Sequence, residues 1–364
     1  MESAGDWCLI ESDPGLLTQL IWSFGAKGVQ VEEFWSMNAN MFEQVGPIYG
    51  VIFLFKYVPN EEPSGPIVTD DRLSTIYFAK QVINNACATI ALISLLLNCN
   101  HPDIDIGPEL KRFKEFTISF DPRMRGLALS NSQTIRQAHN SMTQQSLFDV
   151  GQKVSSADDE AFHFVSYMPI NGRLYELDGL REGPIDHGPI NPDQDWLTVL
   201  QPILFERISK YKEGDINFNL MGLIDDKKMK YERQVNELLT NTPQKDRETE
   251  QFQEALSSLK MNLQYEDYKR FTYKQEMARR KHNYLPFIIT LLQCLAEKKK
   301  LLPLLERMKK RNIPSRMRLN RTNSMTMTNV VLGLRETVKH LLKFDIDSSR
   351  ISIQKFYVLA SERV

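Results

Sequence analysis

Two strand-like runs joined by a tight turn constrain the fold of this chain more than any other feature. Residues 162–168 read FHFVSYM, residues 173–178 read RLYELD, and Asn171-Gly172 lies in the connection. Runs rich in aromatic and β-branched residues are typical of strands, and Asn-Gly is the dipeptide that two-residue hairpin turns prefer. The pattern predicts an antiparallel hairpin within a mixed α/β (α+β) domain.

The register of this hairpin places a histidine beside a carboxylate. With Asn171 and Gly172 as the turn, the numbers of paired residues add up to 343, so Val165 faces Asp178. His163 then lies diagonally across from Asp178 on the same face of the hairpin. Their backbone positions are roughly 7 to 8 Å apart, a distance that the two side chains can span. A carboxylate in that place can fix the tautomer of the imidazole and stabilise the imidazolium.

Cys87 is the candidate nucleophile. Helical periodicity extends from about Thr75 to Leu97, and either Asn84 or Asn85 is expected to cap the helix that carries the thiol. A thiol in the first turn of a helix lies at the positive end of the helix dipole, which favours the thiolate. A lone cysteine is more often a small buried residue, so the assignment depends on the histidine and carboxylate of the hairpin.

Gln81 is the candidate oxyanion donor, six residues before Cys87. Its side-chain amide can join the backbone N–H of Cys87 in stabilising a tetrahedral intermediate. Taken alone, Gln81 is more readily explained as a polar surface residue. The other histidines are weaker candidates and most are expected to be solvated; they are His101, His139, His187, His282 and His340.

Charge divides the chain into two parts. Residues 1–225 contain 30 acidic and 16 basic residues, a formal charge of −14, whereas residues 226–364 contain 16 and 29, a charge of +13. Fields of opposite sign suggest different partners, and the acidic part should favour a basic protein. We expect a mixed domain over residues 1–225, a helical domain over 226–311 and an unassigned basic tail over 312–364.

Hydrophobic patterns place further elements within these parts. Residues 14–25 predict a helix, while residues 29–34 and 51–57 predict strands, the second of them central in the sheet. Residues 141–160 predict a long polar loop, which is either functional or a tolerated insertion. In the basic part we expect an apolar helical stripe and a second helical block over residues 284–308; the stripe consists of Phe252, Leu256, Leu259 and Leu263.

The four cysteines are far apart, with no CxxC or Cys/His cluster. Neither a disulfide framework nor a zinc site is indicated, so we expect reduced thiols and no metal or organic cofactor. The first residues do not resemble a signal peptide, and the longest apolar run is too short to span a bilayer. A location in the cytoplasm and nucleus is therefore expected.

Five sequence blocks resemble the ubiquitin C-terminal hydrolases, a family of papain-like cysteine deubiquitinases. The blocks are WCLIESDP from Trp7, FAKQVINNACAT around Cys87, GLALSNS from Gly126, AFHFVSY around His163 and NGRLYELDGLREGPI around Asp178. The similarity extends to Leu223. Ala88 replaces a glycine common in the family, and RKHNYLPFI at residues 280–288 resembles the docking domain of its long-tailed, proteasome-associated branch.

The resemblance implies both a fold and an activity. It implies a central antiparallel sheet between helices, a knotted backbone and a crossover loop at about residues 141–160. Cys87 would be the nucleophile, His163 the base and then the acid, Asp178 the orienting group and Gln81 an oxyanion donor, in hydrolysis after the C-terminal glycine of ubiquitin.

The resemblance also implies partners. Ubiquitin would be both substrate and bound product, a proteasomal ubiquitin-receptor subunit would bind the helical tail, and a nuclear chromatin-remodelling complex is a further candidate. Neither nucleic acid nor membrane binding is expected. Two rival functions are left open by the residues themselves, namely a papain-like acyltransferase and a ubiquitin-binding scaffold whose catalysis is incidental.

Overall fold

The structure is a computed structural model that describes residues 7–35, 42, 45–58, 61–142, 162–210 and 218–311. The predicted loop at 141–160 therefore lies outside the described residues except for Ser141 and Met142, as does the tail from residue 312. The chain divides into two compact units, residues 1–282 and residues 283–364. None of the described helices is both long enough and apolar enough to cross a bilayer.

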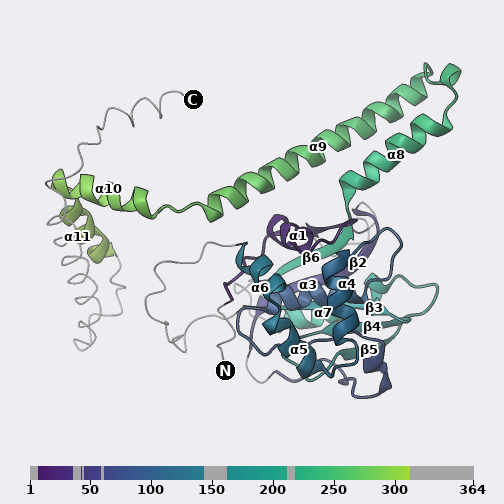
Figure 1. Ribbon diagram of the computed structural model, residues 1–364, viewed down its shortest axis with the longest axis horizontal. Helices are drawn as coiled ribbons and strands as arrows, with labels where there is room; N and C mark the ends of the chain where they lie inside the picture. The colour runs from purple at the N-terminus through teal and green to yellow at the C-terminus, as the bar shows by residue number, and fades with distance from the viewer. Residues whose placement is uncertain are drawn as a thin grey trace. The chain divides into compact units, whose positions relative to one another are not determined.

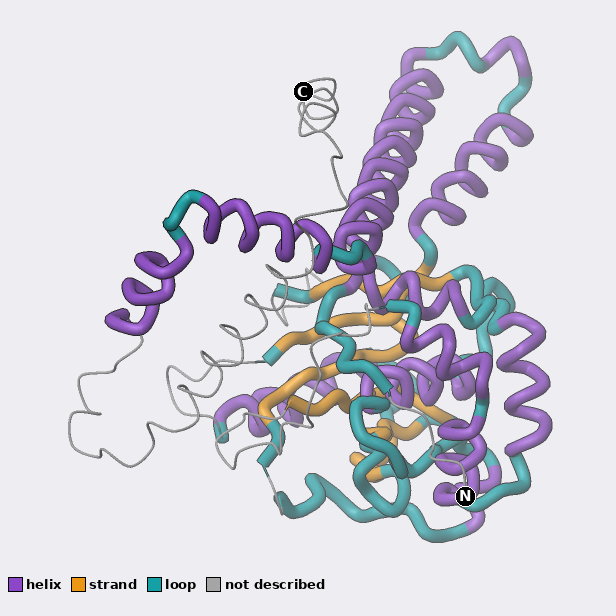
Figure 2. The backbone as a smooth tube through the Cα atoms, turned by 60° about the vertical axis from the view of Figure 1, so that its left-hand side comes forward, coloured by secondary structure: helices purple, strands orange, loops and turns teal. Residues whose placement is uncertain are grey.

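A six-stranded antiparallel sheet forms the centre of the first unit, in the order β1-β6-β2-β3-β4-β5 among the described residues (Figure 2). Its strands are β1 (Val29–Glu33), β2 (Ile48–Lys56), β3 (Phe162–Ile170), β4 (Arg173–Leu177), β5 (Ile185–Pro189) and β6 (Asn219–Asp225). β2 pairs with β3 and β6 and is largely buried, so the prediction of a central strand there is confirmed.

Helices cover both faces of this sheet, which gives a layered mixed fold (Figure 1). α1 and α3 pack on one face around Leu17, Leu92 and Phe164, while α7 packs on the other around Val165 and Leu200. The described helices of this unit are α1 (Pro14–Ser23), α3 (Cys87–Asn98), α4 (Gly107–Thr117), α5 (Pro122–Asn131), α6 (Gln133–Asn140), α7 (Trp196–Ser209), α8 (Lys227–Asn241) and α9 (Glu250–Lys281). The predicted fold class is confirmed.

The segment before α3 is not helical, so the prediction of a helix from Thr75 is wrong. A short 3-10 turn at Asp71–Ser74 is followed by an irregular segment, and the helix begins only at Cys87. The buried Arg125 guanidinium donates to the carbonyl oxygens of Leu73 and Ile76, at 3.4 and 3.0 Å. A side chain distant in sequence thus accounts for the hydrogen bonds of these two carbonyl groups. The spacing of apolar residues within the segment does not reveal that contact.

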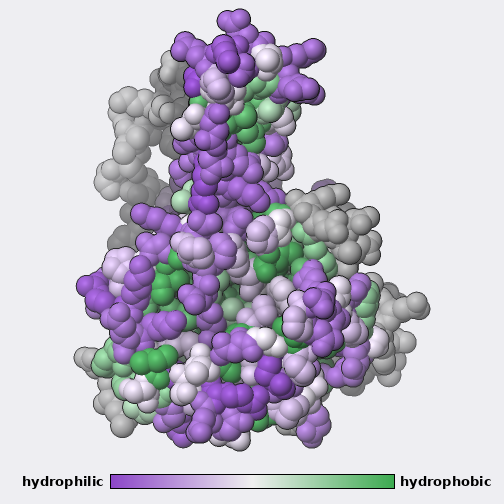
Figure 3. All heavy atoms as spheres, turned by 90° about the vertical axis from the view of Figure 1, so that its right-hand side faces the viewer, coloured by the Kyte–Doolittle hydropathy of each residue, from purple (hydrophilic) through white to green (hydrophobic). Residues whose placement is uncertain are grey.

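α8 and α9 form a helical hairpin, and the predicted apolar stripe of α9 is confirmed. Phe252 is buried and the other three stripe residues are partly buried. In Figure 3 the hairpin surface is mostly hydrophilic, with a hydrophobic area near its tip. Farther along α9, the guanidinium of Arg270 lies 4.7 Å from the ring centre of Trp22 and pairs with Asp226. α9 therefore packs against the sheet-containing part of the unit.

The second unit contains two described helices, α10 (Leu285–Glu297) and α11 (Leu301–Arg311). The single helical block predicted over residues 284–308 is thus broken at residues 298–300, where Lys299 adopts a left-handed φ of 55°. Pro286 lies in the first turn of α10, where its missing N–H costs no helical hydrogen bond. Several apolar side chains of α10 are exposed, among them Phe287 and Leu291.

Candidate active site

The hairpin brings the predicted histidine and carboxylate together. β3 and β4 pair in the predicted register, with Ser166 opposite Leu177 and Ile170 opposite Arg173. Asn171 and Gly172 have φ values of 51° and 74°, as a type I′ turn requires. Nε2 of His163 lies 2.6 Å from Oδ1 of Asp178, and both side chains are almost completely buried.

Two further groups hold the Asp178 carboxylate. Oδ1 also accepts the backbone N–H of Leu180 at 3.0 Å, and Oδ2 accepts Nε of Arg181 at 3.2 Å. A carboxylate with several donors has its orientation fixed, so it can hold the imidazole in one position. Sequence reasoning missed Arg181, although it lies only three residues after Asp178 in the LDGLRE block.

Cys87 is the first residue of α3, and its side chain is hydrogen-bonded to His163. Because Nε2 of His163 is bound to Asp178, Nδ1 is the ring nitrogen left for the thiol. The predicted asparagine cap of this helix is wrong, since Ala86 is the N-cap and no side chain caps it. Asn85 instead has a left-handed φ of 63° and donates to the carbonyl oxygen of Trp7 at 3.0 Å.

The pKa of His163 reflects opposing effects. Burial lowers the pKa, whereas the hydrogen bonds to Asp178 and Cys87 and the attraction to their charges raise it more, to about 9. The imidazolium is therefore favoured at neutral pH, where it can support a thiolate on Cys87. Phe55 and Tyr57 contact the imidazole edge-on, with ring centres 5.9 and 6.0 Å away.

Gln81 lies in the irregular segment before α3, beside Gly179, which is the residue that follows Asp178. Its backbone N–H donates to the carbonyl oxygen of Gly179 at 2.7 Å. Its side-chain oxygen is buried, and no group among the described residues donates to it. The structure thus places the Gln81 backbone against the carboxylate end of the Cys87–His163–Asp178 set.

Two of the other histidines are held by internal hydrogen bonds rather than solvated. His139 on α6 is fully buried, with Nε2 2.7 Å from the carbonyl oxygen of Cys8 and Nδ1 2.7 Å from Oγ1 of Thr89. Burial lowers its pKa to about 4, so it is neutral and acts as a structural bridge between α6, α3 and the N-terminal segment. His187 contacts the buried carboxylate of Glu176 at 3.2 Å.

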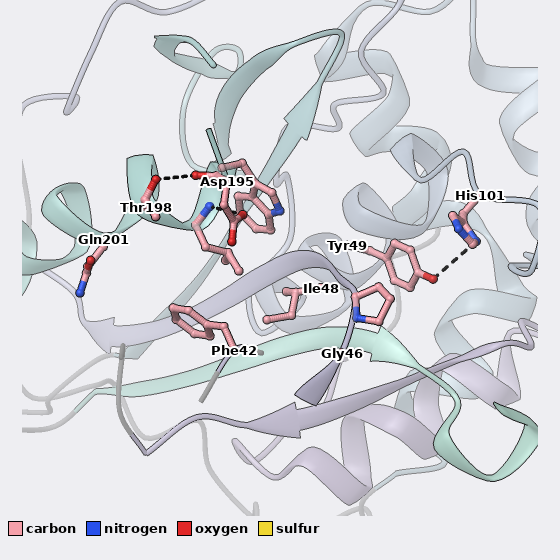
Figure 4. A pocket seen from close by; sticks show the side chains of 11 residues that line it. Phe42, Gly46, Ile48, Tyr49, His101, Asp195, Thr198 and Gln201 are labelled. Carbon is pink, nitrogen blue, oxygen red and sulfur yellow. Dashed lines mark hydrogen bonds between the residues drawn. The ribbon is translucent and has the colours of Figure 1, made fainter. Parts of the chain in front are cut away.

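A cavity of about 480 Å³ lies at the other end of the sheet (Figure 4). Phe42 and Ile48 line it on one side, and residues of the first turns of α7, including Thr198, line it on another. Ile48 begins β2, whereas His163 pairs with Phe55 near the end of the same strand. Seven residues of strand separate these positions by roughly 20 Å, so this cavity is not the candidate active site.

Comparison with known proteins identifies the family. The model of ubiquitin carboxyl-terminal hydrolase family 1 matches residues 7–209, and a second model of ubiquitin carboxyl-terminal hydrolases matches residues 256–301. The chain belongs to the ubiquitin carboxyl-terminal hydrolase family. It is a cysteine deubiquitinase, and the family, fold class and enzyme class expected from the sequence are confirmed.

Relatives of this ubiquitin carboxyl-terminal hydrolase cover most of its length. The Caenorhabditis elegans hydrolase ubh-4 is 43% identical over 306 residues, 84% of this chain and 92% of that protein. Isozyme L5 of Dictyostelium discoideum is 38% identical over 333 residues, 83% of this chain and 95% of the relative. The likeness thus includes the α8–α9 region as well as the sheet-containing part.

A solved structure agrees with these relatives. Trichinella spiralis UCH37, bound to ubiquitin vinyl methyl ester, is 41% identical, with a TM-score of 0.61; the match covers 74% of this chain and all of that one. That relative therefore binds a ubiquitin derivative.

Proposed function

We propose that this hydrolase cleaves the bond after the C-terminal glycine of ubiquitin through a thioester on Cys87. The observation that carries the proposal is the hydrogen-bonded series Cys87, His163 and Asp178, assembled from the start of α3 and from one hairpin. Nucleophile, base and orienting acid in contact are the arrangement that thiol-based acyl transfer requires. The Trichinella relative bound to ubiquitin vinyl methyl ester supports ubiquitin as substrate and bound product.

The reaction proceeds in two acyl-transfer steps. The Cys87 thiolate attacks the carbonyl carbon of the terminal glycine, while the backbone N–H of Cys87 and the Gln81 amide stabilise the oxyanion. His163 gives its proton to the leaving amine, the C–N bond breaks, and a thioester remains. His163 then takes a proton from water, the hydroxide attacks the thioester, and ubiquitin leaves with a free carboxylate as the thiol is regenerated.

Substitution of Cys87 tests this assignment. Cys87→Ala should lower the turnover of a fluorogenic ubiquitin C-terminal amide below detection, because no other group supplies the thioester. It should keep ubiquitin binding, measured by calorimetry. Cys99→Ala is the matched control, since Cys99 lies at the other end of α3 and burial raises the pKa of its thiol to about 11. Turnover that persists in Cys87→Ala, or labelling by ubiquitin vinyl methyl ester at another cysteine, would refute the nucleophile.

We also propose partners and a location. The exposed apolar side chains of α10 support a protein partner for the second unit, and the resemblance of residues 280–288 to the long-tailed branch suggests a proteasomal ubiquitin-receptor subunit. A chromatin-remodelling complex is the second candidate partner. Both partners, and the cysteine spacing, are consistent with a location in the cytoplasm and nucleus.

A further inference from the structure

We infer that Gly179 is a positioning residue for the oxyanion hole: the absence of a side chain there sets the separation between Gln81 and helix α3. This inference rests on the proposed roles of Cys87 and Gln81. It concerns a residue that touches both elements of the hole and would not itself contact the substrate.

Gly179 fits between the two elements with no room for a methyl group. A Cβ built on Gly179 would lie 3.1 Å from Cγ2 of Ile90 and 3.3 Å from Cβ of Gln81. Both distances are shorter than ordinary van der Waals contacts. Ile90 is one turn after Cys87 on α3, and its backbone N–H donates to the carbonyl oxygen of Ala86. A methyl group at residue 179 would therefore act as a wedge between Gln81 and the helix that presents Cys87.

The position of Gln81 depends on this contact because little else holds its side chain. The backbone N–H of Gln81 donates to Gly179, whereas its side-chain oxygen is buried and accepts no hydrogen bond from the described residues. An amide group that is not fixed by hydrogen bonds takes its place from packing around its Cβ. The Cβ of Gln81 lies so close to Gly179 that a Cβ built on that glycine would be 3.3 Å from it.

Gly179 is itself fixed, so a wedge there would move Gln81. Asp178 accepts the N–H of Leu180 and the Nε of Arg181, which closes the turn around Gly179. On the Gln81 side, Lys80 pairs with Glu182 across the same contact. The φ of Gly179 is not in the left-handed region, so alanine would be tolerated by the backbone and its effect would be steric.

The test is a double-mutant cycle on residues 179 and 81. Gly179→Ala should lower kcat on the fluorogenic ubiquitin amide roughly tenfold, because a shift of a few tenths of an ångström weakens an interaction made in the transition state. KM and ubiquitin affinity, the latter measured in the Cys87→Ala background, should change less than about twofold. Gln81→Ala should cost roughly a hundredfold in kcat, and adding Gly179→Ala should then cost almost nothing further.

A second variant separates the wedge from a folding defect. Ile90→Leu keeps the side-chain volume but removes Cγ2, the atom nearest to the added methyl group. The pair Gly179→Ala/Ile90→Leu should therefore recover most of the lost kcat.

The possible outcomes distinguish the inference from the proposed function. The positioning role would be overturned if Gly179→Ala left kcat unchanged. It would also be overturned if Gly179→Ala lowered kcat by the same factor in the Gln81→Ala background. The same conclusion follows if Ile90→Leu brings no recovery in a folded protein. Labelling of Cys87 by ubiquitin vinyl methyl ester, followed in all variants, tests the nucleophile independently; its absence in the unsubstituted chain would contradict the proposed function instead.

Discussion

The carboxylates of Asp178 and Glu176 belong to the same hairpin but lie in different environments. Asp178 accepts a hydrogen bond from His163, which in turn interacts with the candidate nucleophile, whereas Glu176, two residues earlier, is fully buried beside Arg207 and His187. Burial raises the pKa of Glu176, but the hydrogen bond from His187 and the attraction to Arg207 lower it more, to about 2. Glu176 is thus a structural anion, because Arg207, His187 and Ser64 hold it and no hydrogen bond among the described residues joins it to Cys87 or His163.

Asp178→Asn is predicted to change both the rate and its pH dependence. The amide cannot stabilise the imidazolium, so kcat should fall by about 10²- to 10⁴-fold and the pKa of His163 should move down from about 9. In the unsubstituted protein, protonated His163 stabilises the fold fully below its unfolded pKa of about 6.5, and this stability is lost as pH rises through about 9. Urea unfolding between pH 6 and 9.5 should show that loss, and Asp178→Asn should flatten it. An unchanged rate and an unchanged profile would remove the orienting role.

The helix-level feature with the clearest consequence is the packing of α9 on α1. A Cβ on Gly15 of α1 would lie 2.5 to 2.8 Å from ring atoms of Tyr273 on α9. Lys269 and Arg280 of the same helix pair with Glu32 and with acidic residues before α1. The glycine allows the aromatic ring to lie directly on the helix backbone, and the ion pairs fix the direction of approach.

A Gly15→Ala substitution is predicted to lower the free energy of unfolding of the unsubstituted protein and to raise that of the Tyr273→Ala variant. Alanine favours a helix over glycine by about 1 kcal/mol, but overpacking against Tyr273 costs about 1–3 kcal/mol, so the single variant should have a lower free energy of unfolding. In the Tyr273→Ala background the ring is gone and the same change should stabilise the protein. Thermal unfolding measures both. A stabilising effect in the unsubstituted chain would show that α9 does not pack on α1 as described.

The whole chain contains two compact units. Its first 225 residues are strongly acidic and the remainder strongly basic, and some of this opposite charge is paired within the first unit, where Lys269 of α9 contacts Glu32 and Arg280 contacts Glu11 and Asp13. The candidate active site lies entirely within residues 1–282, as does the hairpin formed by α8 and α9. The second unit contributes no described residue to the site.

Deletion of residues 283–364 is predicted to separate catalysis from partner binding. The shortened chain keeps its sheet, both apolar cores and the candidate active site, so its melting temperature and its kcat on a ubiquitin C-terminal amide should stay close to those of the full chain. Capture by an immobilised proteasomal ubiquitin-receptor subunit should be lost. Phe287→Asp in the full chain is the matched point variant. Undiminished capture by the shortened chain would place the docking surface elsewhere.

Features that depend on neighbours along the chain could be predicted from the amino-acid sequence alone. Turn chemistry at Asn171-Gly172 and the period of two in its flanking runs fixed the register, and the register brought His163 within reach of Asp178. The expected roles of Cys87 and Gln81 needed the family resemblance as well, because a lone cysteine or glutamine carries little information.

Features that depend on groups distant in sequence could not be predicted, because they arise when the elements pack together. The irregular segment before α3 is held by Arg125, the burial of His139 depends on Cys8 and Thr89, and the close approach of Gln81 to Gly179 joins segments about a hundred residues apart. Hydrophobic periodicity reports which face of an element is apolar. It does not report which side chain satisfies a carbonyl or fills a gap, because those partners are set by how the elements pack.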